Sequence, residues 1–403
     1  MQNLTLSDAL SRVAPSPTIA VSDKARRLKA EGRDVIALAA GEPDFATPEH
    51  IAEAGIKAIK DGKTGYTAVD GIPELKAAVA RKFERDNGLR YDPSSEIVVT
   101  SGGKFVIYAA MMATLNAGDE VLIPAPYWVS YPDIVKLAGG KPVIVPTRPE
   151  HGFRLEGQAL AEAITPQTRW LILNYPSNPS GAVLFREALE EIAEVLRAHP
   201  QVWVLSDDIY EHVVYDAAFH TLAEVAPDLK DRVLTMNGAS KAYSMTGWRI
   251  GYAGGPKPLL DGMRKLLSQS TSNPCSISQW AAAAALDGPH DFLAERNAAF
   301  RARRDRMIEV FEKAGGFSID RPEGAFYLYP SCAGLIGGRF GGRVLATDMD
   351  VAEALLDDSL VALVPGTAFG LSPYLRLSYA ASMDELEEAG RRITAFAAKV
   401  ERS

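Results

Sequence analysis

Short runs of apolar and β-branched residues alternate with longer amphipathic segments over the first three quarters of the chain. The apolar runs predict strands at residues 96–100, 120–123, 141–146, 170–174, 202–207, 233–237 and 248–253. Segments between them, such as 103–115 and 186–198, have the spacing of amphipathic helices. Alternating strands and helices predict an α/β unit with a largely parallel sheet, in which ligands bind beyond the carboxyl ends of the strands.

The pattern changes after about residue 294. A long charged helix at 295–314 is followed by shorter predicted strands near 317–320, 325–329, 361–364 and 375–378. Because strands and helices no longer alternate strictly, this part predicts a smaller α+β domain. We therefore expect three parts: an N-terminal segment at 1–47 that packs with the small domain, a large domain at 48–294 and a small domain at 295–403.

Composition and charge narrow the classes of protein that fit. The chain has 403 residues and a net charge of −8, which argues against a broad nucleic-acid-binding surface. The two cysteines, Cys275 and Cys332, form no C-x-x-C pair, so neither a zinc site nor a redox motif is expected. We expect no signal peptide and no membrane-spanning run, and therefore a cytoplasmic protein.

The first candidate site follows the predicted strand at 233–237. Lys241 lies among small and hydroxyl residues, and Arg249 follows eight residues later. An amine in a cleft can have a lowered pKa and form an imine with an aldehyde, and an arginine can bind a phosphate. The alternative is an exposed lysine and arginine in a glycine-rich loop.

A second candidate lies where the predicted strand at 202–207 ends in a carboxylate. A buried Asp207 would need a cationic partner, and the protonated ring nitrogen of a pyridine cofactor would be one. Tyr210, three residues later, could donate a hydrogen bond to the phenolic oxygen of the same ring. The alternative is that Asp207 caps a helix.

Two further segments lie at strand ends and could contact the same ligand. Asn178 lies between two prolines that restrict its backbone, so its amide could donate to a phenolate oxygen; a simple turn is the alternative. Gly102 and Gly103 lie between a strand and a helix, where backbone N–H groups could bind phosphate. The P-loop spacing is missing, and a tight chain reversal is the alternative.

An aromatic residue and an arginine complete the set. Trp128 could stack on a cofactor ring, or it could fill the core. Arg376 lies in a short apolar strand, where a guanidinium without a partner would be costly. A substrate carboxylate held by two parallel hydrogen bonds would satisfy it, as would an internal pair with Asp or Glu.

Taken in order, these motifs resemble those of the class I aminotransferases of the aspartate aminotransferase fold family. The resemblance extends from Ala40-Gly-Glu-Pro-Asp44 to Arg376-Leu-Ser-Tyr379, nearly the whole chain. Among its branches, the sequence is most similar to bacterial aspartate aminotransferases, some of which also use prephenate or arogenate. The resemblance implies fold-type I, with a mostly parallel seven-stranded sheet, and pyridoxal 5'-phosphate as the cofactor.

The resemblance also implies a role for each matching residue. Lys241 matches the Schiff-base lysine, which would also move the substrate α-proton, and Asp207 would pair with the pyridine nitrogen. The remaining cofactor-binding residues would be Gly102, Gly103, Trp128, Asn178, Tyr210, Arg249 and, from a neighbouring subunit, Tyr66. Substrate would be bound by Gly41, Trp128, Asn178, Arg376, Lys104, Ser16 and Thr18, with Arg376 on the α-carboxylate and Lys104 on a second carboxylate.

The implied reaction is ping-pong transamination between L-aspartate or L-glutamate and 2-oxoglutarate or oxaloacetate, with prephenate as a further acceptor. The implied assembly is a homodimer with shared active sites. Phe105, Tyr175, Ser177 and Asp208 depart from common family residues; none of these departures removes a catalytic role, and Phe105 and Tyr175 bear on the shape of the side-chain pocket. Aromatic amino-acid transamination or another reaction on the same fold, such as a lyase, remains an alternative. A DNA-binding regulator with a degenerate aminotransferase domain is disfavoured by the acidic charge.

Overall fold

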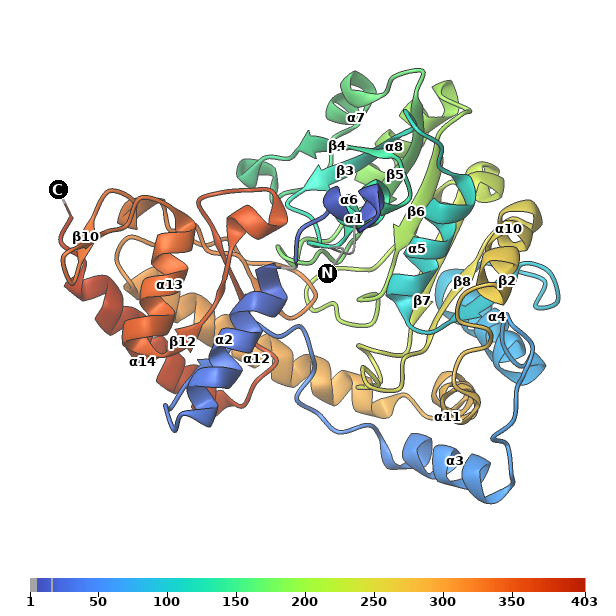
Figure 1. Cartoon of the computed structure of the whole chain (residues 1–403), viewed down its shortest axis with the longest axis horizontal. Coiled ribbons are helices and arrows are strands. Elements are labelled where there is room, and N and C mark those ends of the chain that lie inside the picture. The colour runs from blue at the N-terminus through green and yellow to red at the C-terminus, as the bar shows by residue number, and fades with distance from the viewer. Residues whose placement is uncertain (1–5, 16, 403) are drawn as a thin grey trace, which may run out of the picture.

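A seven-stranded sheet forms the centre of the larger part of the molecule (Figure 1). The computed structural model describes residues 6–15 and 17–402. The strand order is β2-β8-β7-β6-β5-β3-β4, and only β8 runs antiparallel to its neighbours. The strands are β2 (Ile97–Thr100), β3 (Glu120–Ala125), β4 (Lys141–Pro146), β5 (Thr168–Leu173), β6 (Trp203–Asp207), β7 (Val233–Gly238) and β8 (Gly251–Gly254). The prediction of a mostly parallel α/β sheet is confirmed.

The strand boundaries predicted from sequence agree with the structure to within two residues at six of the seven strands. The exception is β8, which begins at Gly251 rather than at the predicted residue 248. Arg249 has φ of 56°, a left-handed conformation that an extended strand cannot include. The residues before Gly251 therefore form a loop that carries Lys241 and Arg249.

Helices cover both faces of this sheet because the strand residues alternate in direction and are apolar on both sides. Val98, Ile123 and Ile172 pack with one group of helices, whereas Val99, Leu122 and Leu171 pack with the other. The first group is α5 (Gly103–Thr114), α6 (Tyr131–Leu137) and α10 (Lys257–Ser268). The second group is α4 (Pro73–Asn87), α8 (Arg186–Ala198) and α11 (Ser276–Asp287), with α3 (Glu49–Lys60) lying against α11. The shorter helices here are α7 (Gly157–Ala163), α9 (Leu222–Val225), η1 (Pro149–His151) and η2 (Pro227–Arg232).

A second core lies beside the sheet and is reached through the long helix α12 (Asp291–Lys313) (Figure 1). Its antiparallel sheet has the order β13-β14-β9, and α13 (Asp348–Ser359) and α14 (Met383–Lys399) pack with it. The remaining elements are β9 (Tyr327–Leu328), η3 (Ala333–Leu335), β10 (Arg339–Phe340), β11 (Arg343–Val344), β12 (Val361–Ala362), β13 (Val364–Pro365), η4 (Gly366–Phe369) and β14 (Leu375–Ser378). The strand expected at 317–320 does not form; Ser318 makes only an isolated antiparallel bridge to Ser331.

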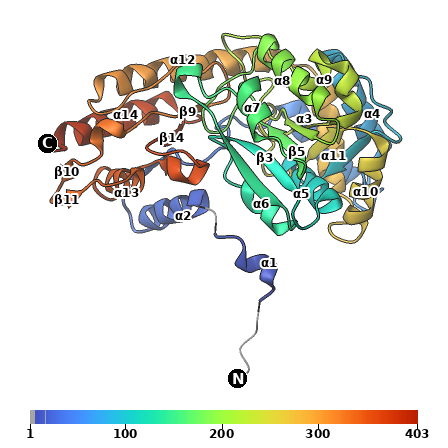
Figure 2. The same cartoon turned by 90° about the horizontal axis from the view of Figure 1, so that it is seen from above.

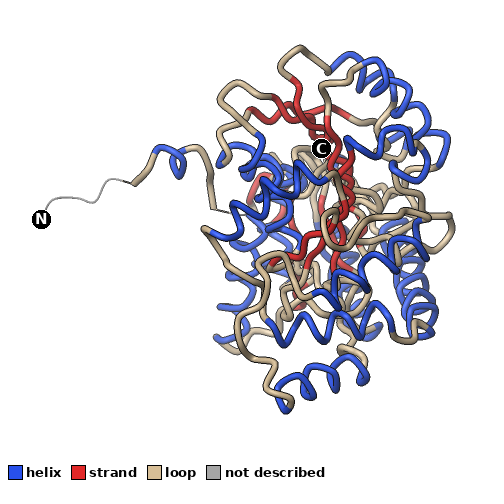
Figure 3. The backbone as a smooth tube through the Cα atoms, turned by 90° about the vertical axis from the view of Figure 1, so that its right-hand side faces the viewer, coloured by secondary structure: helices blue, strands red, loops and turns tan. Residues whose placement is uncertain are grey.

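The N-terminal segment joins the second core. Its strand β1 (Ile36–Ala37) pairs in parallel with β12, and Ile36 and Leu38 are buried in that core. Helix α2 (Pro17–Ala30) lies against the same part, whereas α1 (Asp8–Ser11) projects beyond it and comes close to α6 of the larger part (Figures 2 and 3). We propose that the two cores correspond to domains at 48–294 and 295–403, with 1–47 packing on the smaller one.

Two further observations concern membrane-spanning segments and the state of the cysteines. Among residues 6–15 and 17–402, no helix combines the length and apolar character needed to cross a bilayer. Both cysteines are free thiols, Cys275 being exposed and Cys332 buried.

Candidate active site

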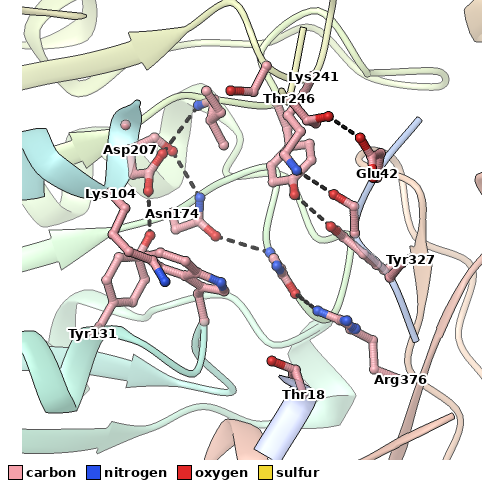
Figure 4. A pocket seen from close by; sticks show the side chains of 18 of the residues that line it. Thr18, Glu42, Lys104, Tyr131, Asn174, Asp207, Lys241, Thr246, Tyr327 and Arg376 are labelled. Atoms are coloured by element: carbon pink, nitrogen blue, oxygen red, sulfur yellow. Dashed lines mark hydrogen bonds between the residues drawn. The ribbon is translucent and has the colours of Figure 1, made fainter. Parts of the chain in front are cut away.

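A cavity of about 510 Å³ opens at the carboxyl ends of β5, β6 and β7, between the two cores and under α2. Its size is in the usual range for a small-molecule site. Most of the residues singled out in the sequence line it together: Thr18, Gly41, Gly103, Lys104, Trp128, Asn178, Asp207, Tyr210, Lys241, Arg249 and Arg376. Figure 4 shows side chains from both cores pointing into the same space.

Lys241 lies on the loop after β7, and its ammonium donates a hydrogen bond to the Gly41 carbonyl oxygen (Figure 4). Burial, together with the positive charge of Arg376, lowers the pKa of Lys241 to about 8. Glu42 and Asp207 oppose this shift through their negative charges. A larger fraction of this amine is therefore neutral near pH 7 than for an ordinary lysine, and a neutral amine is the form that attacks a carbonyl carbon.

Asp207 ends β6 and is buried at the base of the cavity. The Tyr131 hydroxyl donates to its Oδ2 at 2.6 Å, and the Ile209 N–H contacts its Oδ1 at 3.4 Å. Burial raises the pKa of the Asp207 carboxyl to about 6, although the hydrogen bond from Tyr131 opposes the rise. A cationic ligand beside Asp207 would offset the cost of burying its charge.

The neighbouring Asp208 is buried but does not line the cavity, and it allows the effect of burial on a carboxyl pKa to be tested. Ser206 Oγ donates to Asp208 Oδ1 at 2.7 Å, while Oδ2 has no hydrogen-bond partner among the described residues. Burial raises the pKa of Asp208 to about 7 from the model-peptide value of 3.8. The folded state therefore holds this proton from about pH 4 to about pH 7, and its contribution to stability is lost as the pH rises through that window.

We expect Asp208→Asn to remove this pH-dependent decrease in the free energy of unfolding, which amounts to up to about 4 kcal/mol in the wild type. Urea unfolding at about pH 5.5 and about pH 8 should show a smaller drop in the midpoint for the variant than for the wild type. Asp228→Asn is the matched control because Asp228 is an exposed carboxylate paired with Arg197. An equal drop in Asp208→Asn and wild type would contradict the assignment.

Gly102, Gly103 and Arg249 lie together at the start of α5, in a cradle whose chemistry suits an anion. Gly102 has φ of 92°, and a Cβ there would collide with the Arg249 guanidinium. Arg249 donates to the Thr246 carbonyl at 2.9 Å, and no carboxylate within the described part of the chain pairs with it. The free N–H groups of a helix N-terminus beside an unpaired guanidinium suit a phosphate dianion.

Arg376 comes from β14 and is only 3% exposed. Its Nη1 donates to Asn178 Oδ1 at 2.9 Å and its Nη2 donates to the Ala39 carbonyl at 2.5 Å. Its Nε has no hydrogen-bond partner among the described residues, and the internal pair with Asp or Glu that was the alternative is not found there. A buried guanidinium without a counterion is suited to a carboxylate ligand.

Lys104 lies on the side of the cavity opposite Arg376 (Figure 4), and Trp128 also lines the cavity. The Lys104 ammonium lies 4.9 Å from the centre of the Trp128 ring, a cation–π distance. Burial, together with the positive charge of Arg249, lowers the pKa of Lys104. No carboxylate of residues 6–15 or 17–402 pairs with Lys104, so a negatively charged ligand group would stabilise it.

Two of the predicted residues that the structure describes, Gly102 and Tyr66, do not line this cavity. The Tyr66 side chain is 95% exposed, and its predicted role concerns a neighbouring subunit. Ser16 lies outside the described residues, so its predicted role stays a prediction.

Several lining residues were given no role from the sequence, namely Glu42, Tyr131, Asn174, Ser240, Thr246 and Tyr327. Asn174 and Ser240 lie at strand ends, which is a usable signal. Tyr131 and Tyr327 gave none, because a tyrosine within an apolar segment is usually a core residue.

The cavity holds an amine that can bond to a carbonyl carbon, and around it lie groups that can bind two or more anions. This arrangement suits the transfer of amino groups between amino acids and keto acids. The fold and the site thus define a transferase that acts on amino groups. Comparison with known proteins narrows this class, because the profile of class I and class II aminotransferases matches residues 33–393. The chain belongs to this family.

Relatives of known name span nearly the whole chain. The aspartate/prephenate aminotransferase of Cereibacter sphaeroides is 56% identical over 395 residues, which is 98% of each chain. The aspartate aminotransferase of Rhizobium meliloti is 52% identical over 96% of this chain and 94% of its own.

Solved structures give the same family. A crystal structure of the aspartate aminotransferase from Rhizobium meliloti has a TM-score of 0.96 at 50% identity and covers 99% of this chain and 100% of its own. The aspartate aminotransferase from Thermus thermophilus with maleate has a TM-score of 0.92 at 42% identity, covering 98% and 100%.

Proposed function

We propose that this aminotransferase uses pyridoxal 5'-phosphate to move the amino group of L-aspartate or L-glutamate to 2-oxoglutarate or oxaloacetate, with prephenate as a further acceptor. The observation that carries the proposal is the joint placement of Lys241, Asp207 and Arg376 around one cavity. A single small molecule in that cavity can meet an amine, a carboxylate and a guanidinium.

The residues present fit the cofactor. Asp207 is a buried carboxylate suited to a protonated pyridine nitrogen, and the cradle of Gly102, Gly103 and Arg249 is suited to the phosphate. Trp128, Tyr210 and Asn178 line the same cavity, where Trp128 would offer a ring face and the other two would donate to the phenolic oxygen. When bound, pyridoxal phosphate supplies an aldehyde that bonds reversibly to amines and a ring that accepts electrons.

The protein groups then have distinct roles. Arg376 holds the substrate α-carboxylate and so orients the bond from the α-carbon to its hydrogen. Lys241, whose pKa is lowered to about 8, would take the proton from that α-carbon and, as an acid, would deliver it to the carbon of the cofactor aldehyde group. Asp207 keeps the ring nitrogen protonated by supplying the opposite charge.

The charge of the cavity supports a dicarboxylic substrate. Basic side chains outnumber acidic ones in its lining: Arg26, Lys104, Lys241, Arg249 and Arg376 against Glu42 and Asp207. A phosphate and one α-carboxylate account for Arg249 and Arg376, and Arg26 already pairs with Asp23, which leaves Lys104 for a second carboxylate. The Thermus thermophilus relative was solved with maleate, which is a dicarboxylate.

The test is a panel of amino donors assayed with 2-oxoglutarate, oxaloacetate and prephenate as acceptors. We expect aspartate and glutamate to be the preferred donors, and Lys104→Ala to lower kcat/KM for aspartate by about 10- to 100-fold, the value of a charge-assisted hydrogen bond. Aromatic donors, which lack a second carboxylate, should be affected much less.

Lys136→Ala is the control for this panel, because Lys136 pairs with Asp133 on α6 and does not line the cavity. Equal losses for aspartate and aromatic donors in Lys104→Ala would reject the role of Lys104. Release of ammonia without formation of a new amino acid would instead indicate a lyase.

We also propose a homodimer with shared active sites, acting in the cytoplasm. The exposed side chains of Ile56, Ile59 and Tyr66 lie on and just after α3, where a second copy would cover them. Two free cysteines fit a reducing compartment. A monomer with full activity in analytical ultracentrifugation and assay would contradict the shared site, and recovery from a membrane or secreted fraction would contradict the location.

A further inference from the structure

Two tyrosine hydroxyls meet at the edge of the cavity. The hydroxyl oxygens of Tyr210 and Tyr327 are 2.7 Å apart, and both side chains are buried. Tyr210 follows β6 of the large sheet, whereas Tyr327 belongs to β9 of the small sheet. Tyr327 points into the cavity toward the side where Lys241 lies (Figure 4).

The direction of this hydrogen bond follows from counting donors. Each phenolic hydroxyl has one hydrogen to donate and can accept from two directions. If Tyr210 donates into the cavity, its hydrogen is used, and Tyr327 must be the donor in the bond between them. The Tyr327 hydroxyl has no other hydrogen-bond partner among the described residues, so its hydrogen is available for Tyr210.

The surroundings of Tyr327 keep its hydroxyl in place. The Arg376 guanidinium lies 4.8 Å from the centre of the Tyr327 ring, and the ring packs at 82° to that of Tyr210. A Cβ on Gly41 would collide with the Tyr327 hydroxyl, so glycine at that position leaves the space that the hydroxyl occupies. The Tyr327 ring contacts Arg376 and Tyr210, whereas the hydroxyl fills the space beside Gly41 and bonds to Tyr210. Replacement by phenylalanine would keep the ring contacts and remove only those of the hydroxyl.

We propose that Tyr327 is a positioning residue that donates its hydrogen bond to Tyr210 and thereby directs the Tyr210 hydroxyl hydrogen at the phenolic oxygen of bound pyridoxal phosphate. This inference rests on the proposed cofactor and on the proposed role of Tyr210. A hydroxyl that accepts a hydrogen bond is polarised and becomes a stronger donor. Tyr327 therefore stabilises negative charge on the phenolic oxygen without touching the cofactor itself.

The charged groups that face the tyrosine pair are Arg376 from β14, Asp207 from the end of β6 and Lys241 from the loop after β7. Tyr327→Phe leaves all three in place. A change in the titration of the bound cofactor in this variant would thus report the loss of the hydroxyl and not the loss of a charge.

The experiment is a pH titration of the absorbance of the lysine-bound cofactor in the complete holoenzyme. In Tyr327→Phe we expect the midpoint to rise by about half to one pH unit, the value of one hydrogen bond, because the negative phenolic oxygen is less stabilised. We expect kcat for aspartate to fall by several-fold, while KM changes little because Arg376 keeps its place.

Two further variants show whether Tyr327 acts through Tyr210. Tyr210→Phe should raise the midpoint more than Tyr327→Phe does, and the double variant should match Tyr210→Phe alone. Tyr379→Phe is the matched control, since it is a buried tyrosine of the same core whose hydroxyl bonds to the Ala325 carbonyl outside the cavity. Its midpoint should equal that of the wild type.

An unchanged midpoint in Tyr327→Phe would overturn the proposal, and so would additive shifts in the double variant. A lowered midpoint would also overturn it, because it would mean that Tyr210 had been donating to Tyr327. If Tyr327→Phe gives too little folded protein, Gly41→Ala is the second variant, because its added Cβ displaces the same hydroxyl. We expect Gly41→Ala to raise the midpoint, and an unchanged midpoint would overturn the proposal. A wild type without cofactor absorbance would instead refute the proposed function.

Discussion

Replacement of Lys241 by alanine is expected to lower the rate of aspartate transamination by at least about 10⁴-fold, the upper range for loss of a general acid–base group. The variant should also lose the absorbance of the lysine-bound cofactor. Among the described residues, the only other lysine that lines the cavity is Lys104, which lies on the side opposite Arg376. Spectra and steady-state assays on the same preparation measure both effects.

The control for this prediction is Lys257→Ala. Lys257 is an exposed lysine that pairs with Asp261 on α10, away from the cavity. It should keep wild-type spectra and rates. Ordinary turnover with an unchanged absorbance band in Lys241→Ala would refute the assignment of the cofactor-bearing residue.

The second large effect is expected from Arg376. Arg376→Ala should lower kcat/KM by about 10³-fold for every amino-acid donor, since removing one partner from a buried charge pair typically costs 3–5 kcal/mol. Arg376→Lys should lower it by about 10²-fold, because a lysine cannot make two parallel hydrogen bonds to a carboxylate. Cofactor absorbance should persist in both variants.

This uniform loss separates Arg376 from Lys104, whose removal should affect dicarboxylic donors selectively. Arg306→Ala is the control, as Arg306 pairs with Glu309 and Glu387 away from the cavity. If Arg376→Ala weakened aspartate but spared aromatic donors, Arg376 would bind the second carboxylate and the two assignments would have to be exchanged.

Much of the site could be predicted from the sequence because it lies at strand ends. Gly102, Asn178, Asp207 and Lys241 each follow or end a strand of one sheet, and the carboxyl ends of its parallel strands share an edge. The apolar runs identified those strands, so a short list of polar residues after them already contained the centre of the cavity.

Other parts could not be predicted from local pattern. Gly41 and Thr18 come from the N-terminal segment, and only the resemblance to a family indicated them. The bonds of Tyr131 to Asp207 and of Tyr327 to Tyr210 join residues 76 and 117 positions apart, and no local spacing signals such pairs. The predicted start of β8 was wrong because Arg249 adopts a left-handed backbone conformation in a segment that reads as apolar.

The hydrogen bond from Arg376 to Asn178 bears on how substrate affinity can change between related enzymes. One partner belongs to the small sheet and the other to the loop after β5, so the bond spans the seam between the two cores. If Arg376 holds the substrate α-carboxylate as proposed, that binding site is complete only when the two cores are correctly placed relative to each other. Natural variation far from the ligand, in the packing along that seam, can thus strengthen or weaken affinity without altering any residue that the substrate meets.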